Sequence, residues 1–281
     1  KSNVFFNTGF INRQPQFNAV FPNYANVVNP DLRNEKVKSF EIGYGFKADK
    51  VTVNVNAYAT SWGNRFISRS LFNAQGDQGT AQFKNVSESH KGLEIEGTYR
   101  PVSKLKLQGS VSIGDWRYTK DFKATLFDAN QQEIGEGVLY LKDAKVGDAA
   151  QVTTYFGADY YLGDIGIGKV TIDASYRTAG NLYADYAPTD AVFLEPKNAG
   201  PVKLPSYGLA DLGFTSRYTL FGNKVTARVN INNLFNTTYI SESETNIHAD
   251  GNAMTWKGVD VRNSVWFGFG RTWNASLKYT F

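Results

Sequence analysis

Apolar and polar residues alternate with a period of two along most of this chain. Ten segments follow the rule, and they span residues 3–12, 37–48, 51–60, 81–100, 105–119, 151–162, 169–180, 206–220, 223–240 and 263–281. In the third segment, Val51, Val53 and Val55 alternate with Thr52 and Asn54. Such alternation places one set of side chains on each face of a β-strand. Helical periodicity is not convincing anywhere, so the pattern predicts an all-β protein with ten strands.

The connections between these segments alternate in length. Short connections at residues 48–50, 101–104, 163–168 and 221–223 separate longer ones at 13–36, 73–79, 120–149, 182–204 and 241–262. An antiparallel sheet with short turns at one end and long loops at the other is the layout of an outer-membrane barrel. The segments run for about 12 to 18 residues, whereas strands of soluble sheets have about 5 to 6 and a membrane crossing needs about 9 to 11. We therefore predict a transmembrane antiparallel β-barrel, with a large soluble β-sandwich or β-helix as the alternative.

The chemistry of the two faces predicts which one meets lipid. Hydrocarbon cannot solvate charge, so the apolar face must be exposed to lipid and the polar face must line the lumen. The charged residues that we expect in the lumen are Glu41, Glu94, Glu96, Arg100, Asp173, Arg177 and Arg228. Arg271 interrupts the apolar face of the last segment, and at mid-bilayer it would cost about 2–4 kcal/mol. We expect it near an interface or against a neighbouring subunit.

Aromatic residues gather at the ends of the predicted strands, as in the interfacial girdles of membrane barrels. The turn-side group is Tyr160, Tyr161, Tyr218, Phe221, Tyr279 and Phe281, and the loop-side group is Trp62, Phe66, Trp116, Tyr118 and Trp266. The long loops also carry aromatic and amide side chains that suit sugars or aromatic siderophores. The candidate ligand-binding residues are Tyr24, Asn26, Tyr140, Tyr183, Tyr186 and Trp256. Packing of the loops against each other explains these residues equally well.

Composition excludes some classes of function. There is no cysteine, so disulfides, thiolate metal sites and nucleophilic thiols are absent. The net charge of +4 comes from 30 basic and 26 acidic residues. They form no basic block of the kind that binds nucleic acid, so we expect no nucleic-acid partner. The mean hydropathy of −0.37 suits a soluble protein and a membrane barrel equally.

Candidate catalytic chemistry is sparse. The two histidines are His90, in a polar stretch, and His248, in the last long loop near Glu242 and Glu244. No nucleophile elbow, phosphate-binding loop or paired-histidine metal motif is present. We expect no enzymatic activity, cofactor or metal. The alternatives are a self-contained ten-stranded outer-membrane enzyme, similar to the omptin proteases, and a structural or adhesin-like barrel.

Several runs in the sequence, taken in order, resemble one family. They are NVFFNTGFINRQPQF (3–17), NPDLRNEKVKSFEIGYGFK (29–47), VNVNAYATSW (53–62), HKGLEIEGTYRP (90–101), KLQGSVSIGDW (106–116) and NINNLFNTTYI (230–240), followed by the terminal Phe281. Together they resemble the C-terminal half of the barrel of TonB-dependent outer-membrane receptors, of the Bacteroidetes type. The resemblance covers nearly the whole chain.

This resemblance implies an architecture and a function. Residues 1–281 would form the last ten strands of a barrel of about 22, with the plug domain and the earlier strands outside this chain. The receptor would bind a scarce nutrient, such as a ferric siderophore or an oligosaccharide, at its extracellular loops. TonB and its inner-membrane complex would drive import through the plug. Leu277, Tyr279 and Phe281 resemble the signal that the barrel-assembly machinery reads. Whether a surface lipoprotein covers the barrel is left open.

Overall fold

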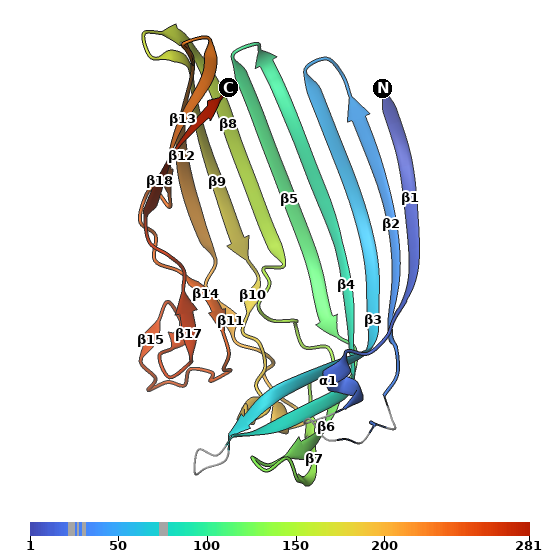
Figure 1. Ribbon diagram of the computed structural model, residues 1–281. Helices are drawn as coiled ribbons and strands as arrows, with labels where there is room; N and C mark the ends of the chain where they lie inside the picture. The colour runs from blue at the N-terminus through green and yellow to red at the C-terminus, as the bar shows by residue number, and fades with distance from the viewer. Residues whose placement is uncertain (22–25, 27, 30–31, 73–77) are drawn as a thin grey trace.

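The computed structural model describes residues 1–21, 26, 28–29, 32–72 and 78–281. Ten long strands stand side by side and form a curved wall (Figure 1). They are β1 (Ser2–Arg13), β2 (Glu35–Lys47), β3 (Val51–Phe72), β4 (Gln78–Val102), β5 (Leu105–Tyr118), β8 (Val152–Ile165), β9 (Gly168–Gly180), β12 (Tyr207–Leu220), β13 (Asn223–Asn232) and β18 (Thr272–Thr280). All ten predicted strands are present in the predicted order, which confirms the predicted fold class.

The strands are ordered as a meander. Each of the ten pairs antiparallel with its neighbour in the sequence of long strands, from β1 at one edge to β18 at the other. Within the described residues, β1 and β18 do not pair with each other. The sheet is therefore open, and it is not the closed ten-stranded barrel that a self-contained enzyme or adhesin would form.

The tight turns and the chain termini lie at one end of the wall, and the long loops lie at the other (Figure 1). The loop end carries β6 (Phe122–Phe127), β7 (Glu133–Leu139), β10 (Leu182–Tyr183), β11 (Lys203–Leu204), β14 (Ile240–Ser243), β15 (Thr255–Trp256), β16 (Val259–Asp260) and β17 (Val265–Phe267). Strand β6 pairs with β7 and with the extended start of β4. The helices are α1 (Phe17–Val20) and the 3-10 turn η2 (Ala191–Leu194). Within the described ranges, no helix is long and apolar enough to span a membrane.

The last predicted strand is divided in two. Sequence alternation predicts one strand over residues 263–281, whereas β17 pairs with β14 in the loop region and β18 pairs with β13 in the wall. Residues 268–271 separate them, and this break contains Arg271. Gly268 lies directly under the ring of Tyr239, and Gly270 lies against Asn236. An added Cβ would clash at either position, so close packing against Tyr239 and Asn236 favours glycine within the break. The predicted segment 223–240 also ends early, at Asn232, because Asn233 takes a left-handed conformation.

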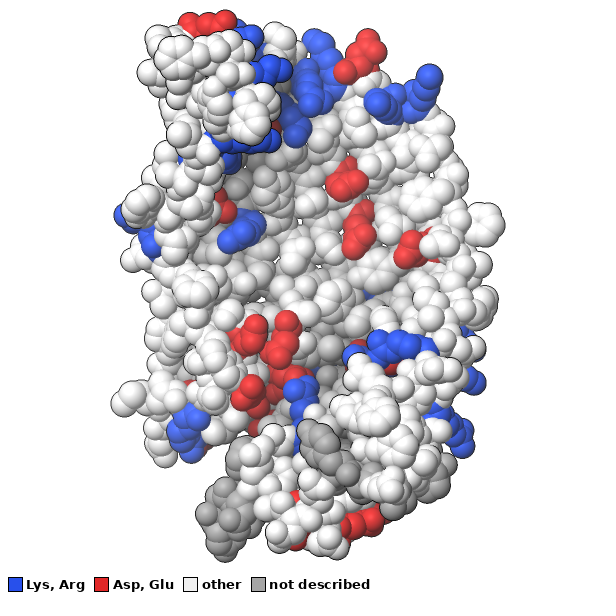
Figure 2. All heavy atoms as spheres, in the orientation of Figure 1, with Lys and Arg blue, Asp and Glu red and all other residues white. Residues whose placement is uncertain are grey.

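The outward face of the wall is apolar and exposed. Its exposed residues include Phe6, Phe10, Phe40, Ile42, Leu93, Ile95, Leu107, Ile113, Phe156, Tyr176, Leu212, Val229, Trp273 and Leu277. A continuous apolar face of this size suits contact with lipid. The opposite face is hollowed and carries scattered acidic and basic side chains (Figure 2).

Candidate functional site

The polar face of the wall collects the predicted lumen residues. The strand registers pair Asn56 with Glu94, Asn54 with Glu96, and Asp159 with Asp173. The pairing of the neighbouring strands and the alternation along each strand place Glu41, Arg177 and Arg228 on the same face. Arg100 lies four residues after Glu96, near the turn end of β4, and an even separation places both residues on the same face. All seven predicted residues thus share one face of one sheet.

The acidic side chains at the middle of the half of this face formed by β8 to β13 have basic partners. Arg228 donates to Asp173 through Nη1–Oδ1 at 2.8 Å and Nη2–Oδ2 at 2.9 Å. It also donates to Thr215 Oγ1 at 2.7 Å, which fixes the guanidinium in place. Lys106 Nζ lies 3.7 Å from Asp159, and an Arg177 nitrogen lies 3.9 Å from Asp211. Bidentate pairing by Arg is strong and directional, so Asp173 and Arg228 neutralise each other within the wall.

The half formed by β2 to β5 is acidic and less complete. Glu41, Glu94 and Glu96 line a hollow of about 590 Å³ together with Phe5, Asn54 and Ser110. Glu96 accepts a hydrogen bond from Asn54 Nδ2 at 2.9 Å. Glu41 and Glu94 form no ion pair with any described residue, and the buried Oδ1 of Asn56 has no described donor. This hollow is therefore suited to hydrogen-bond donors and positive charge.

An aromatic group lies on the same face near the loop end. The His90 ring stacks on Trp116 with centroids 5.2 Å apart, and Trp62 lies 6.5 Å from His90 on the other side. Trp116 Nε1 donates to Tyr58 Oη at 2.9 Å. His90 Nε2 also lies 2.9 Å from a carboxylate oxygen of Glu88.

This aromatic group corrects the predicted loop-side girdle. Trp62 and Trp116 were expected at a lipid interface, but their registers place them on the polar face with Glu94. Tyr118 is buried on that face as well. Counting by twos from Glu94 to His90, and from Ser112 to Trp116, would have identified this group from the sequence.

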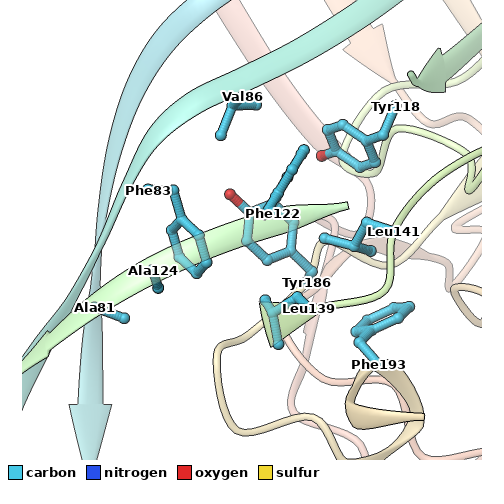
Figure 3. Packing of buried hydrophobic residues seen from close by; sticks show 10 residues of the cluster. All are labelled: Ala81, Phe83, Val86, Tyr118, Phe122, Ala124, Leu139, Leu141, Tyr186 and Phe193. Atoms are coloured by element: carbon cyan, nitrogen blue, oxygen red, sulfur yellow. The ribbon is translucent and has the colours of Figure 1, made fainter. Parts of the chain in front are cut away.

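The loops form a packed hydrophobic core of their own (Figure 3). Its buried members are Ala81, Phe83, Val86, Tyr118, Phe122, Ala124, Leu139, Leu141, Tyr186 and Phe193. The candidate Tyr186 is 4% exposed, and its ring makes edge contacts with Phe83, Tyr118 and Phe122. Burial strongly raises the pKa of its hydroxyl. The structure therefore gives Tyr186 a packing role, and ligand contact stays a prediction.

The other candidate ligand-binding residues are spread over the loop region. The backbone N–H of Tyr140 donates to Phe193 O at 2.8 Å, and Lys145 Nζ lies 5.9 Å from the ring centre of Tyr183. Trp256 packs against Phe267, next to a second loop core that contains Leu182, Ala184 and Val259. Asn26 is exposed, and Tyr24 lies outside the described residues.

Acidic side chains face one another across the loop assembly. Partial desolvation, together with the neighbouring charges of Asp185, Glu242 and Glu244, raises the pKa of Asp148 to about 6. Within the described part of the chain, no group of three or more His, Asp and Glu side chains is placed to hold a metal ion. His248 instead lies 2.8 Å from Gly200 O, in a loop contact.

The comparisons with known proteins agree with this architecture. Residues 2–234 match the family model described as "TonB dependent receptor-like, beta-barrel". The chain belongs to this family. Its members are outer-membrane proteins, which confirms the predicted location. No curated protein sequence matches the chain.

Solved TonB-dependent receptors share the fold. The copper transporter OprC aligns with a TM-score of 0.65 and 17% identity, over 99% of this chain and 37% of its own. The ferric yersiniabactin receptor FyuA from Yersinia pestis aligns with a TM-score of 0.59 and 14% identity, over 100% of this chain and 34% of its own. The siderophore receptor PiuA from Acinetobacter baumannii gives 0.62 and 14%, over 99% and 34%. The chain thus spans about a third of the length of these structures.

Proposed function

We propose that these ten strands form the C-terminal part of the barrel of a TonB-dependent receptor that imports a scarce nutrient. The observation that carries the proposal is the open wall, with one apolar face, one polar face and two unpaired edges, β1 and β18. Unpaired backbone groups in lipid cost several kcal/mol each, so both edges need partner strands. Twelve further strands would complete a barrel of about 22. The relatives are named as transporters and receptors, and nothing in them points to an enzyme.

The acidic hollow supports a plug inside that barrel. Glu41 and Glu94 lack ion partners among the described residues, and Asn56 Oδ1 lacks a donor. Charged groups left without partners in a filled interior are costly. Basic side chains of a plug domain, packed against β2 to β5, would complete them. The plug in turn would receive the pull from TonB.

The proposed ligand site is the loop end of the wall. Asn26, Tyr140, Tyr183 and Trp256 would contact a flat ligand directly, with Tyr24 beside them and Tyr186 supporting the loops. A ferric siderophore is one ligand class, since relatives are named for ferric yersiniabactin and siderophores; an oligosaccharide is the other. For a Bacteroidetes-type receptor, a surface lipoprotein would be a further partner. Leu277, Tyr279 and Phe281, all exposed, would engage the barrel-assembly machinery.

Growth and uptake test this proposal. A strain lacking the gene for the receptor should grow normally on rich medium and lose growth on one defined iron or glycan source. Uptake of that nutrient should also stop when TonB is removed. The intact polypeptide should have roughly three times the 31.2 kDa of these 281 residues, because the chain spans 37% of one relative. Unchanged growth on every iron and glycan source, or uptake without TonB, would contradict the proposal.

A further inference from the structure

Near the loop end, the outward face of the wall changes from apolar to basic. The row that contains Ile42, Ala57, Leu93 and Ile113 is entirely apolar. Two residues further along each strand towards the loops, the row of paired outward-facing residues is Phe40, Ala59, Lys91 and Asp115. The next row is Lys38, Ser61, Ser89 and Arg117, and Lys36 follows on β2. The apolar belt thus ends in a basic margin formed by Lys36, Lys38, Lys91 and Arg117.

The lysines of this margin are free to bind an external anion. Lys36, Lys38 and Lys91 are exposed, and none forms an ion pair with a described residue. Asp115 is the one acid among the outward-facing strand residues of these rows, and it is already bonded. It accepts from Lys145 Nζ at 2.6 Å and from Arg117 Nε at 2.8 Å. The margin therefore keeps a net positive charge.

The side chains that lie between these basic residues are small. Ala59 and Ser61 on β3 lie between Lys38 and Lys91, and both are exposed. Ser89 separates Ser61 from Arg117. Small side chains flanked by long cationic ones leave room for a head group beside the lipid-facing belt. A head group bound there would place its acyl chains against Phe40, Ile42 and Leu93.

The turn end of the same face lacks such a margin. The outward strand residues there include Phe46, Tyr99, Leu105, Tyr160, Val170, Tyr218, Val225 and Tyr279. The turn-side lysines Lys47, Lys169 and Lys224 alternate with outward residues and so belong to the polar face. The positive charge is therefore specific to the leaflet on the loop side.

We propose that Lys36, Lys38, Lys91 and Arg117 bind the phosphorylated head group of a lipid in the leaflet on the loop side. Phosphate is recognised by clustered Lys and Arg, and each basic residue near an anionic membrane surface contributes about 1 kcal/mol. The site is continuous with the lipid-facing belt, so its occupant is a lipid and not a free anion. This inference uses the outer-membrane location and does not depend on which nutrient is imported.

Lipid binding to the full-length receptor in neutral detergent tests the site. The probes are a bis-phosphorylated glycolipid, the same glycolipid after removal of its phosphates, and inorganic phosphate, measured by native mass spectrometry. The triple variant Lys36→Gln, Lys38→Gln, Lys91→Gln should weaken binding of the phosphorylated lipid about 100-fold, at about fivefold per lysine. The matched triple variant Lys47→Gln, Lys169→Gln, Lys224→Gln should bind it as the wild type does.

Three results would overturn the inference. They are equal binding by the two triple variants, equal binding of the dephosphorylated lipid, and displacement of the lipid by inorganic phosphate at similar concentration. All of the lysines are at the surface, so the folded state is checked independently by the mobility of unheated protein in a gel. Nutrient uptake by the margin variant should be retained. A wild-type receptor that binds the lipid but imports no nutrient would contradict the proposed function and leave this inference intact.

Discussion

The carboxyl group of Asp148 ionises less readily in the folded protein than in the unfolded chain. It has a left-handed backbone with φ 56°, its N–H donates to Tyr183 O at 3.0 Å, and its exposed side chain lies near other acids. Its folded-state pKa of about 6 lies above the ordinary value of 3.8. Folding therefore favours the protonated form of Asp148. The contribution of this group makes the folded loops more stable below pH 4 than above pH 6. Stability falls as the pH rises through about 6.

Replacing this carboxylate should stabilise the loops at neutral pH. Asp148→Asn removes the charge, and Asn tolerates the left-handed conformation well. We expect several-fold slower hydrogen exchange in the peptide that contains Tyr183 and Ala184 at pH 7.5, and no change near pH 3. Asp143→Asn is the matched control, since Asp143 is likewise exposed and left-handed, with φ 65°. Faster exchange in Asp148→Asn at pH 7.5 would show that the carboxylate stabilises the loops.

Individual side chains were predictable wherever the alternation continued without interruption. Glu41, Glu94 and Asp173 lie on the face that a count by twos gives them. Trp62 and Trp116 were misplaced because their proximity to strand ends was given more weight than their position in the alternation. Tyr186 could not be recognised as a core residue, since its neighbours come from other loops. Long-range packing of that kind leaves no local pattern in the sequence.

The loop end is a folded element and not a set of independent loops. Strand β6 extends the sheet from β4, and η2 brings the fully buried Phe193 against Leu139 and Leu141 (Figure 3). The loops therefore keep their shape through a common core. A preformed loop assembly loses less conformational entropy when a ligand binds.

Removing one core ring should loosen this assembly. Phe193→Ala deletes a side chain with 0% exposure, and such a change typically costs about 3–5 kcal/mol. Peptides covering residues 122–141 and 183–194 should then exchange hydrogen faster, while those of β8 and β9 should not. The control is Leu194→Ala, because the neighbouring Leu194 is 51% exposed. If the two variants exchange alike, the cluster does not hold the loops together.

Elements were predictable to different degrees for a physical reason. The ten wall strands follow from a strict period of two, since one face meets lipid and the other meets water. The short strands β10, β11, β15 and β16 have two residues each and are too brief to show a period. The break between β17 and β18 was missed because Gly268 and Gly270 fit an alternating pattern. Only the contacts with Tyr239 and Asn236 reveal why both positions lack a side chain.

At the scale of the whole molecule, the two faces of one sheet meet different surroundings. The outward face carries apolar side chains bounded by a basic margin at the loop end. The polar face pairs Arg228 with Asp173 on β13 and β9 and leaves an acidic hollow on β2 to β5. The central claim is that the apolar face contacts lipid and the polar face lines a water-containing lumen.

Spin labels along β4 test this claim directly. The chain contains no cysteine, so single labels can be attached at residues 93, 94, 95 and 96 of the receptor in lipid bilayers. Labels that replace Leu93 and Ile95 should be relaxed strongly by oxygen, which concentrates in lipid, and weakly by a water-soluble nickel chelate. Labels that replace Glu94 and Glu96 face away from lipid and should be relaxed much more weakly by oxygen. Equal accessibility at all four positions, or access of the nickel chelate to positions 93 and 95, would contradict the account.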